Sequence, residues 1–325
     1  DGFACSGCEV LSFLSASQTT AAASGQAEIL NRLIRLEGGV GASDLADNED
    51  SQDVFDYMAG AVVQGHFASG TELFAGARFL GYNTSISNGD ASSSLFAPVA
   101  HVNFPLSSAA RVYAGTDPRI ERQTVWTFSQ ENPFAYFPFV APNVHTVDAE
   151  GGVEVRSNRI GVKAYGGLTI SPTRAFFERD PGSGLFQVEY GKARTMEGGV
   201  DITVLGPAGI EFSAGGALRD GMLTEFDEAL PYFASSVGRV GAQIPFAEGK
   251  GRIGAAAYFE GERPADRAES RTLPAYGRLT IDGAYDFWNG VSVVVRGERL
   301  LGRAEQWEGF PQASYSFMGG IRFVR

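Results

Sequence analysis

The feature that most limits how this chain can fold is a two-residue alternation of apolar and polar side chains that persists over long runs. In 159–170, one face carries Ile160, Val162, Ala164, Gly166, Leu168 and Ile170, and the other carries Arg159, Lys163, Tyr165 and Thr169. Successive side chains of a β-strand point to opposite faces, so this period predicts strand rather than helix. The pattern recurs in 147–156, 208–219 and 278–287.

Strand length separates the two all-β classes that show such alternation. Strands of soluble sandwiches usually have about five or six residues, whereas a tilted membrane strand needs about nine to eleven. The runs here are about ten to twenty residues long, which meets the requirement of a membrane strand. Their apolar positions also accept Gly and Ala freely, as lipid allows but a close-packed core resists. The sequence therefore predicts an all-β, transmembrane, antiparallel up-and-down β-barrel.

The connections between the runs alternate between tight and long, as they do in outer-membrane barrels. The expected tight turns are at Ser69-Gly70, Ser107, Ser157-Asn158, Gly206-Pro207, Glu248-Gly249 and Asn289-Gly290. The expected long loops are 44–53, 82–93, 116–143, 220–230, 261–272 and 302–311. This spacing predicts about fourteen strands, and an even number places both chain ends in the periplasm. We assign residues 26–325 to the barrel, and the Ser-, Ala- and Thr-rich residues 1–25 to a periplasmic lead-in segment.

Composition and charge exclude other classes of protein. No stretch reaches the roughly eighteen consecutive apolar residues that a membrane helix requires. The net charge of −12 and the absence of a Lys/Arg run argue against a nucleic-acid partner. We expect a bacterial outer-membrane protein whose partners are outer-membrane lipid and lipopolysaccharide, together with other outer-membrane or periplasmic proteins.

Cys5 and Cys8 form a single C-x-x-C pair. A structural zinc site needs a second pair or suitably spaced histidines, and His66, His101 and His145 are scattered. We expect a disulfide between the two cysteines, with a redox motif or a remnant metal site as the alternative. No cofactor or metal is expected for the rest of the chain.

Several stretches of the last two-thirds of the chain resemble the C-terminal barrel region of TonB-dependent receptors. The residues that carry the resemblance are Arg299-Leu300-Leu301-Gly302-Arg303, Glu305-Gln306-Trp307-Glu308-Gly309-Phe310-Pro311, Gly319-Gly320-Ile321-Arg322-Phe323, Tyr190-Gly191-Lys192-Ala193-Arg194-Thr195 with Glu197-Gly198-Gly199-Val200-Asp201, and, as a weaker echo, Asn132-Pro133-Phe134. The resemblance implies an outer-membrane barrel. It does not extend to a plug domain or a TonB box, which the sequence does not show, and the terminal aromatic residue is displaced because the chain ends Phe323-Val324-Arg325.

A set of charged residues falls on the polar face of the expected strands, which would line the lumen. Its members are Glu150, Glu154, Arg159, Lys163, Glu211, Glu260, Arg278, Asp282, Arg296 and Arg322. One interpretation is a pore whose field selects solutes by charge. The other, which we favour, is a ladder of opposite charges on neighbouring strands that neutralises itself and fills the interior.

An aromatic-rich segment, 126–139, is the longest irregular stretch. Phe134, Tyr136, Phe137 and Phe139 could contact a partner or fold into the barrel mouth, because clustered exposed aromatic side chains mark interaction surfaces. They could equally continue an aromatic girdle.

No arrangement of residues in the sequence predicts catalysis, since no His is placed with Ser or carboxylate partners. We predict a non-enzymatic, plug-less barrel that acts as a scaffold or as the anchoring subunit of an outer-membrane complex. The alternative is a transport protein, either a passive pore or a reduced relative of the TonB-dependent receptors.

Overall fold

The computed structural model describes residues 17–29, 33–46, 51–86, 89–124, 127–128, 131–136, 141–288, 290–301, 305–311 and 315–323. Cys5 and Cys8 lie outside these residues, so the expected disulfide stays a prediction. Nearly all of the described elements are β-strands, with two single 3-10 turns at Pro207–Gly209 and Ala247–Gly249. Among the described residues, no helix is long and apolar enough to cross a membrane.

The strands are β1 (Ser17–Ile29), β2 (Ile34–Ala46), β3 (Ser51–His66), β4 (Glu72–Ile86), β5 (Gly89–Pro105), β6 (Ala110–Thr116), β7 (Arg119–Glu121), β8 (Ala135–Tyr136), β9 (Asn143–His145), β10 (Val147–Arg156), β11 (Ile160–Arg179), β12 (Phe186–Leu205), β13 (Glu211–Leu223), β14 (Glu228–Ala229), β15 (Ser236–Phe246), β16 (Gly251–Glu260), β17 (Arg263–Pro264), β18 (Thr272–Leu273), β19 (Tyr276–Trp288), β20 (Val291–Leu301), β21 (Glu305–Trp307), β22 (Phe310–Pro311) and β23 (Tyr315–Phe323).

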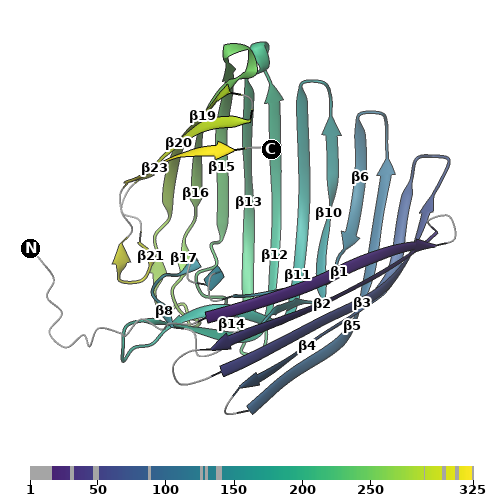
Figure 1. Cartoon of the computed structure of the whole chain (residues 1–325), viewed down its shortest axis with the longest axis vertical. Coiled ribbons are helices and arrows are strands. Elements are labelled where there is room, and N and C mark those ends of the chain that lie inside the picture. The colour runs from purple at the N-terminus through teal and green to yellow at the C-terminus, as the bar shows by residue number, and fades with distance from the viewer. Residues whose placement is uncertain are drawn as a thin grey trace, which may run out of the picture.

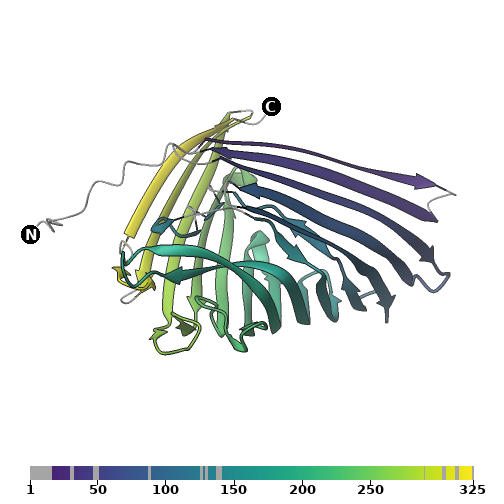
Figure 2. The ribbon, with the colours of Figure 1, turned by 90° about the horizontal axis from the view of Figure 1, so that it is seen from below.

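One 19-stranded sheet contains all of the long strands. Each long strand pairs antiparallel with the next long strand along the chain, from β1 to β23, so the sheet is an up-and-down meander. The sheet curves into a trough with a concave and a convex face (Figures 1 and 2). Among the described residues, no pairing joins β1 to β23. The predicted all-β antiparallel up-and-down architecture is confirmed.

The N-terminal part of the sheet differs from the sequence-based expectation. Strand β1 begins at Ser17 and pairs along its whole length with β2, although residues 17–25 were assigned to the lead-in segment. The described meander therefore starts at the end of the sheet where the long loops lie and finishes, at Phe323, at the end with the tight turns. The expected location of both chain ends in the periplasm depended on an even number of strands. Because the described strands begin and finish at opposite ends of the sheet, they do not support that location.

The expected tight turns are confirmed as far as the structure describes them, because each joins two successive long strands; Asn289 lies outside the described residues. Gly70 and Gly290 adopt φ values of 81° and 78° there, a conformation that suits glycine. Two expected long loops are wrong. Most of 44–53 and 82–93 is strand, because the polar residues at these positions continue the ladder between β2 and β3 and between β4 and β5.

The two faces of the sheet differ in chemistry. Large apolar side chains project from the convex face without cover, and Phe96, Leu218 and Phe317 are 79%, 74% and 77% exposed. The fully buried side chains gather on the concave face instead, where Leu80 and Val144 belong to one cluster. A soluble fold would bury its largest apolar surface, so this inverted distribution is that of a membrane barrel wall. We call the concave face the inner face and the convex face the outer face.

One hairpin bends over the inner face. Strands β6 and β10 continue as the pair β7 and β9 after an interruption at Asp117, Pro118 and Thr146. Proline cannot donate to the ladder, so Pro118 breaks the pairing where the direction changes. We call residues 117–146, as far as they are described, the strap. A second irregularity lies between Ser171 and Arg174 of β11, which also contains a proline, Pro172.

Candidate functional site: the inner wall and the strap

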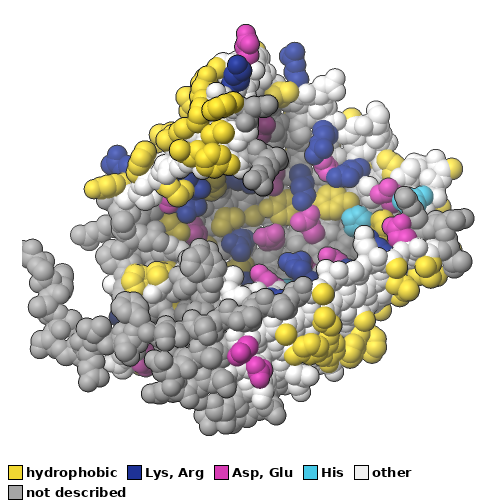
Figure 3. Space-filling view, viewed as in Figure 1, with side chains coloured by type: hydrophobic (Ala, Val, Ile, Leu, Met, Phe, Trp, Pro, Cys, Tyr) yellow, Lys and Arg dark blue, Asp and Glu magenta, His cyan; other side chains and the backbone are white. Residues whose placement is uncertain are grey.

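The inner face carries rows of charged side chains, and most of the residues that the sequence placed in the lumen share this face. Glu154 lies directly opposite Lys163, and Asp282 lies opposite Arg296, so the members of each pair point to the same side. Arg278 likewise lies opposite Tyr258 of β16. Arg159 is the exception in secondary structure, because it lies in the tight turn before β11. Figure 3 shows basic and acidic side chains intermixed in the hollow of the trough.

Many of these charges are paired with each other across neighbouring strands. Lys163 Nζ lies 2.7 Å from Glu150 Oε1, and Glu154 accepts from Arg111 Nε at 2.9 Å. Farther along the wall, Arg278 of β19 lies 3.6 Å from the Glu298 carboxylate of β20, and Arg296, two residues before Glu298 on the same strand, lies 3.7 Å from it. The pairing agrees with a ladder of opposite charges, and each pair is open to water on the side of the trough.

Tyrosine rings accompany several of the inner-face cations. The Lys163 ammonium lies 5.3 Å and 4.9 Å from the ring centres of Tyr113 and Tyr165, and the Tyr113 hydroxyl donates to Glu150 at 2.8 Å. The Arg278 guanidinium lies 5.1 Å from the Tyr258 ring centre. A ring under a cation fixes the position of a long side chain that would otherwise move freely.

A groove of about 610 Å³ lies at the tight-turn end of the inner wall. Its charged lining residues are Arg111, Glu150, Glu154, Arg156, Arg159, Lys163 and Asp201. The groove is open along one side, and its lining has no buried His, Ser and carboxylate arrangement. Its chemistry is that of a hydrated wall which presents both signs of charge to a solute.

The strap crosses the inner face and is held by two arginine pairs at the β2–β4 side. Arg122 binds Asp56 of β3 with both arms of its guanidinium, Nε to Oδ2 at 2.8 Å and Nη2 to Oδ1 at 2.5 Å. Arg78 of β4 donates to Asp117 Oδ1 at 2.5 Å and to the Pro118 carbonyl at 2.7 Å, and it also binds Glu37 of β2. Two-point arginine–carboxylate contacts are strong and directional, so this end of the strap has a fixed position.

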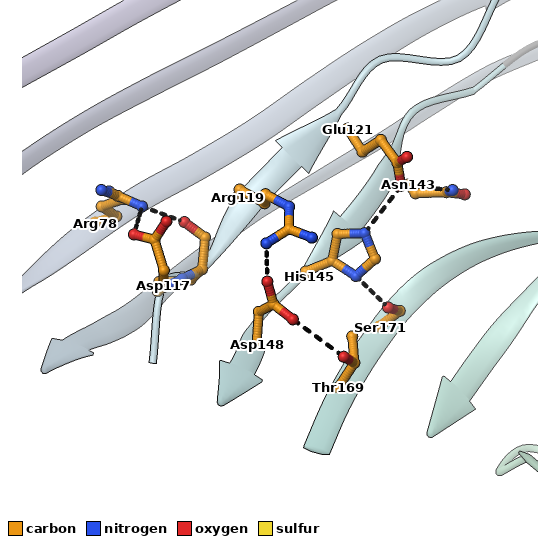
Figure 4. Close-up of polar contacts among 10 residues, drawn as sticks. Arg78, Asp117, Arg119, Glu121, Asn143, His145, Asp148, Thr169 and Ser171 are labelled. Atoms are coloured by element: carbon orange, nitrogen blue, oxygen red, sulfur yellow. Dashed lines mark hydrogen bonds and ion pairs between the residues drawn. The ribbon is translucent and has the colours of Figure 1, made fainter. Parts of the chain in front are cut away.

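A second polar cluster joins the strap to β10 and β11 (Figure 4). His145 Nε2 lies 3.2 Å from Glu121 Oε2, and its Nδ1 lies 2.9 Å from the Ser171 hydroxyl. Asn143 donates to the same Glu121 oxygen at 3.2 Å. Hydrogen bonding, first from His145, lowers the pKa of Glu121 to about 2 and outweighs partial burial. Arg119 pairs with Asp148, which accepts from Thr169 at 3.1 Å.

The wall beneath the strap is apolar, in contrast to the charged part of the inner face near the tight turns. Leu80, Tyr82 and Ala97 of β4 and β5 are buried there against Ala141 and Val144 of the strap. Water-facing positions of a barrel lumen are polar, so an apolar strip on this face is suited to being covered. The strap therefore has a docking surface provided by the wall itself.

The strap also reaches the loops on the other side of the mouth. Phe128 of the strap packs with Phe177, Phe186, Val188 and Trp307, which we call the aromatic cluster. Tyr232 packs against this cluster, with its ring centre 4.7 Å from that of Trp307, and the ring centres of Phe128 and Phe177 lie 6.1 Å apart. Burial raises the pKa of Tyr232 above its ordinary value. Strand β8 of the strap also runs parallel to the start of β12. One segment is thus anchored at opposite walls.

The predicted mouth-loop residues fall within the strap. Phe134 is half-buried against the aromatic cluster, and the backbone of Tyr136 belongs to β8, whereas Phe137 and Phe139 lie outside the described residues. The sequence did not reveal Arg78, Asp56, Arg122 or His145 as partners, because residues 24 to 66 positions apart form these contacts. In the part of the chain that the structure describes, no group of three or more His, Cys, Asp or Glu is arranged to hold a metal ion.

Solved structures similar to this chain are outer-membrane transporters and receptors. The copper transporter OprC matches with a TM-score of 0.63 and 14% identity, covering 95% of this chain and 56% of its own. The FrpB iron transporter from Neisseria meningitidis (F3-3 variant) matches with a TM-score of 0.65 and 8% identity, covering 95% of this chain and 55% of the transporter. BauA, the ferric preacinetobactin receptor from Acinetobacter baumannii, matches with a TM-score of 0.59 and 10% identity. This match covers 94% of this chain and 54% of BauA.

These similarities concern the fold, since the identities are low. The chain spans about half the length of the structures it matches. No protein-family model matches the chain, and no curated protein matches it. The fold is that of an outer-membrane β-barrel of the TonB-dependent receptor type, in agreement with the resemblance in the C-terminal sequence.

Proposed function

We propose that this chain forms the barrel wall of an outer-membrane transporter that takes up metal chelates, with the long loops outside the cell and the tight turns in the periplasm. The observation that carries the proposal is the match of 94% to 95% of the chain to a copper transporter, an iron transporter and a ferric-chelate receptor. The outer face contacts lipid and lipopolysaccharide through its uncovered apolar side chains.

The inner wall supports this proposal through its chemistry. It presents fixed cations and carboxylates along a hydrated trough, and a charged chelate needs such groups to replace its water during passage. The ion pairs do not seal the wall, because the groove of about 610 Å³ remains beside Lys163 and Arg159. The scaffold that the sequence favoured is thus our second candidate.

The test compares cells that make the full-length protein with a matched strain that lacks its gene. We expect accumulation of at least one class of labelled ferric or cupric chelate to fall to background when the gene is absent, and to fall equally when energy coupling from the inner membrane is abolished. Unchanged accumulation of every chelate would contradict transport. Stoichiometric co-purification with other outer-membrane or periplasmic proteins would then support the scaffold.

A further inference from the structure

Residues of the strap meet both sides of the trough, although the strap is one connection between two adjacent strands of the wall. At one side Arg122 binds Asp56, and a side chain placed at Gly41 of β2 would overlap the Arg122 guanidinium. At the other side the strap contacts the aromatic cluster, and Phe186 N–H donates to the Phe134 carbonyl at 3.1 Å. Figure 2 shows the teal strands of this segment running through the concave interior near the loops.

We propose that the strap is an internal barrier that narrows the long-loop mouth of this barrel, and that the Arg122–Asp56 pair is the latch that keeps it docked. This inference goes beyond the proposed function, because it concerns passive passage of solutes of any kind.

The chemistry of the wall favours a docked strap over a loose loop. Leu80 and Ala97 are 0% and 2% exposed beneath the strap, so undocking would expose an apolar strip to water. Asp56 is also nearly inaccessible, with a side chain 6% exposed. A carboxylate this buried needs its cationic partner, so loss of Arg122 leaves an uncompensated charge beneath the strap.

The latch can be separated from the general effect of charge on the inner wall. Arg239 of β15 pairs with Asp201 of β12 at 3.0 Å on the same face. It is not a strap residue, and the residues that line the hollow around it belong to β11–β13, β15, β16 and β19. Reversal of Arg239 therefore changes the field of the lumen while leaving the strap docked, which makes it a matched control for reversal of Arg122.

The experiment uses the full-length protein in the outer membrane of a host that lacks its major porins. Four forms are compared: the unaltered protein, Arg122→Asp, the charge swap Arg122→Asp with Asp56→Arg, and Arg239→Asp. Chymotrypsin cleavage in intact cells reports strap docking, because the strap contains Phe128 and Phe134. Single-channel conductance in planar bilayers and susceptibility to vancomycin report the width of the passage.

We expect Arg122→Asp to make the strap cleavable, to raise the conductance and to sensitise the cells to vancomycin. The penalty of an unpaired buried charge would shift the ratio of docked to undocked strap by about a hundredfold or more. The charge swap should restore all three readouts, and Arg239→Asp should leave cleavage and vancomycin susceptibility unchanged.

Two results would overturn the inference. A strap that becomes cleavable without any change in conductance or vancomycin susceptibility does not narrow the passage. A strap that stays protected in Arg122→Asp, with an unchanged passage, is not held by this pair. If Arg122→Asp fails to reach the outer membrane, Asp56→Asn removes the carboxylate charge alone and is judged by the same three readouts.

Discussion

An arginine placed on the outer face of β12 tests the assignment of that face to lipid. Val200 is 43% exposed there, and its partners on the neighbouring strands are Ala164 and Gly216. Because both partners are small, an arginine would meet few side chains, and the cost would come from the surrounding solvent. Val200 is five residues from Leu205, the end of β12. With a rise of about 3.4 Å and a tilt of about 40°, it lies about 13 Å from the tight-turn end, close to the middle of an apolar band about 25 Å tall.

At this depth Val200→Arg should lower the free energy of unfolding by about 2 to 4 kcal/mol. The assay is guanidinium-induced unfolding of the protein in lipid vesicles, followed by the mobility difference between folded and unfolded barrels in gel electrophoresis. The control is Thr203→Arg on the inner face of the same strand, where the side chain lines the groove and should cost less than about 1 kcal/mol. Equal losses at the two positions, or a larger loss at Thr203, would refute the assignment of the faces.

The remaining predictions concern packing, pH and the mouth. A side chain at Gly76 would overlap the Ala61 carbonyl of the neighbouring strand, whereas nothing lies within 4 Å at Gly161. Gly76→Ala should therefore cost about 1 to 3 kcal/mol of unfolding free energy and Gly161→Ala almost nothing, and similar denaturant midpoints would contradict this. Because the pKa of Glu121 falls from 4.5 to about 2, its contribution to holding β7 and β9 of the strap together is fully present above pH 4.5 and is lost as the pH falls through about 2. Pepsin should therefore cleave the strap at pH 2 faster, relative to an unstructured substrate, than at pH 4.5, and an unchanged relative rate would contradict the prediction. Trp307→Ala should remove about 3 to 5 kcal/mol of local stability from the aromatic cluster, and amide exchange in residues 131–136 should accelerate; unaltered exchange would count against it.

The regular part of the wall could be predicted from the sequence because a barrel strand repeats one local rule. In β11 the residues from Ile160 to Ile170 alternate without a break, and the structure pairs them with β10 and β12 in continuous register. The tight turns were equally local, since Gly70 and Gly290 mark them directly. Fold class and turn positions therefore follow from short-range chemistry.

Strand ends and the first strand were harder to predict, because their residues carry weak apolar signals. In β1 the outward positions include Ala23, Gly25 and Ala27, which contrast little with the neighbouring Ser and Gln. The strands β4 and β5 likewise extend through Ser- and Asn-rich residues that resemble a loop. Hydrogen bonding to an adjacent strand, rather than alternation, determines structure at these positions.

The strap could not be predicted, because nothing local distinguishes an inward from an outward loop. Its direction depends on Arg122 meeting Asp56, and on Arg78 meeting Asp117, across 66 and 39 residues of sequence. Leu80 fits the alternation of an ordinary inner-face position except that it is apolar. Leu80, Tyr82 and Ala97 together depart from a polar inner face, and this departure is the signal that, in hindsight, indicated a covered wall.

The central claim is that lipid covers one face of each long strand and water the other. The most direct measurement places a nitroxide label at each position from Met196 to Val204 of β12, one at a time, in the protein in lipid vesicles. The account predicts that collisions with oxygen, which concentrates in lipid, peak at the even-numbered positions, and that collisions with a water-soluble nickel chelate peak at the odd-numbered ones. Accessibility without a two-residue period, or with the opposite phase, would contradict it.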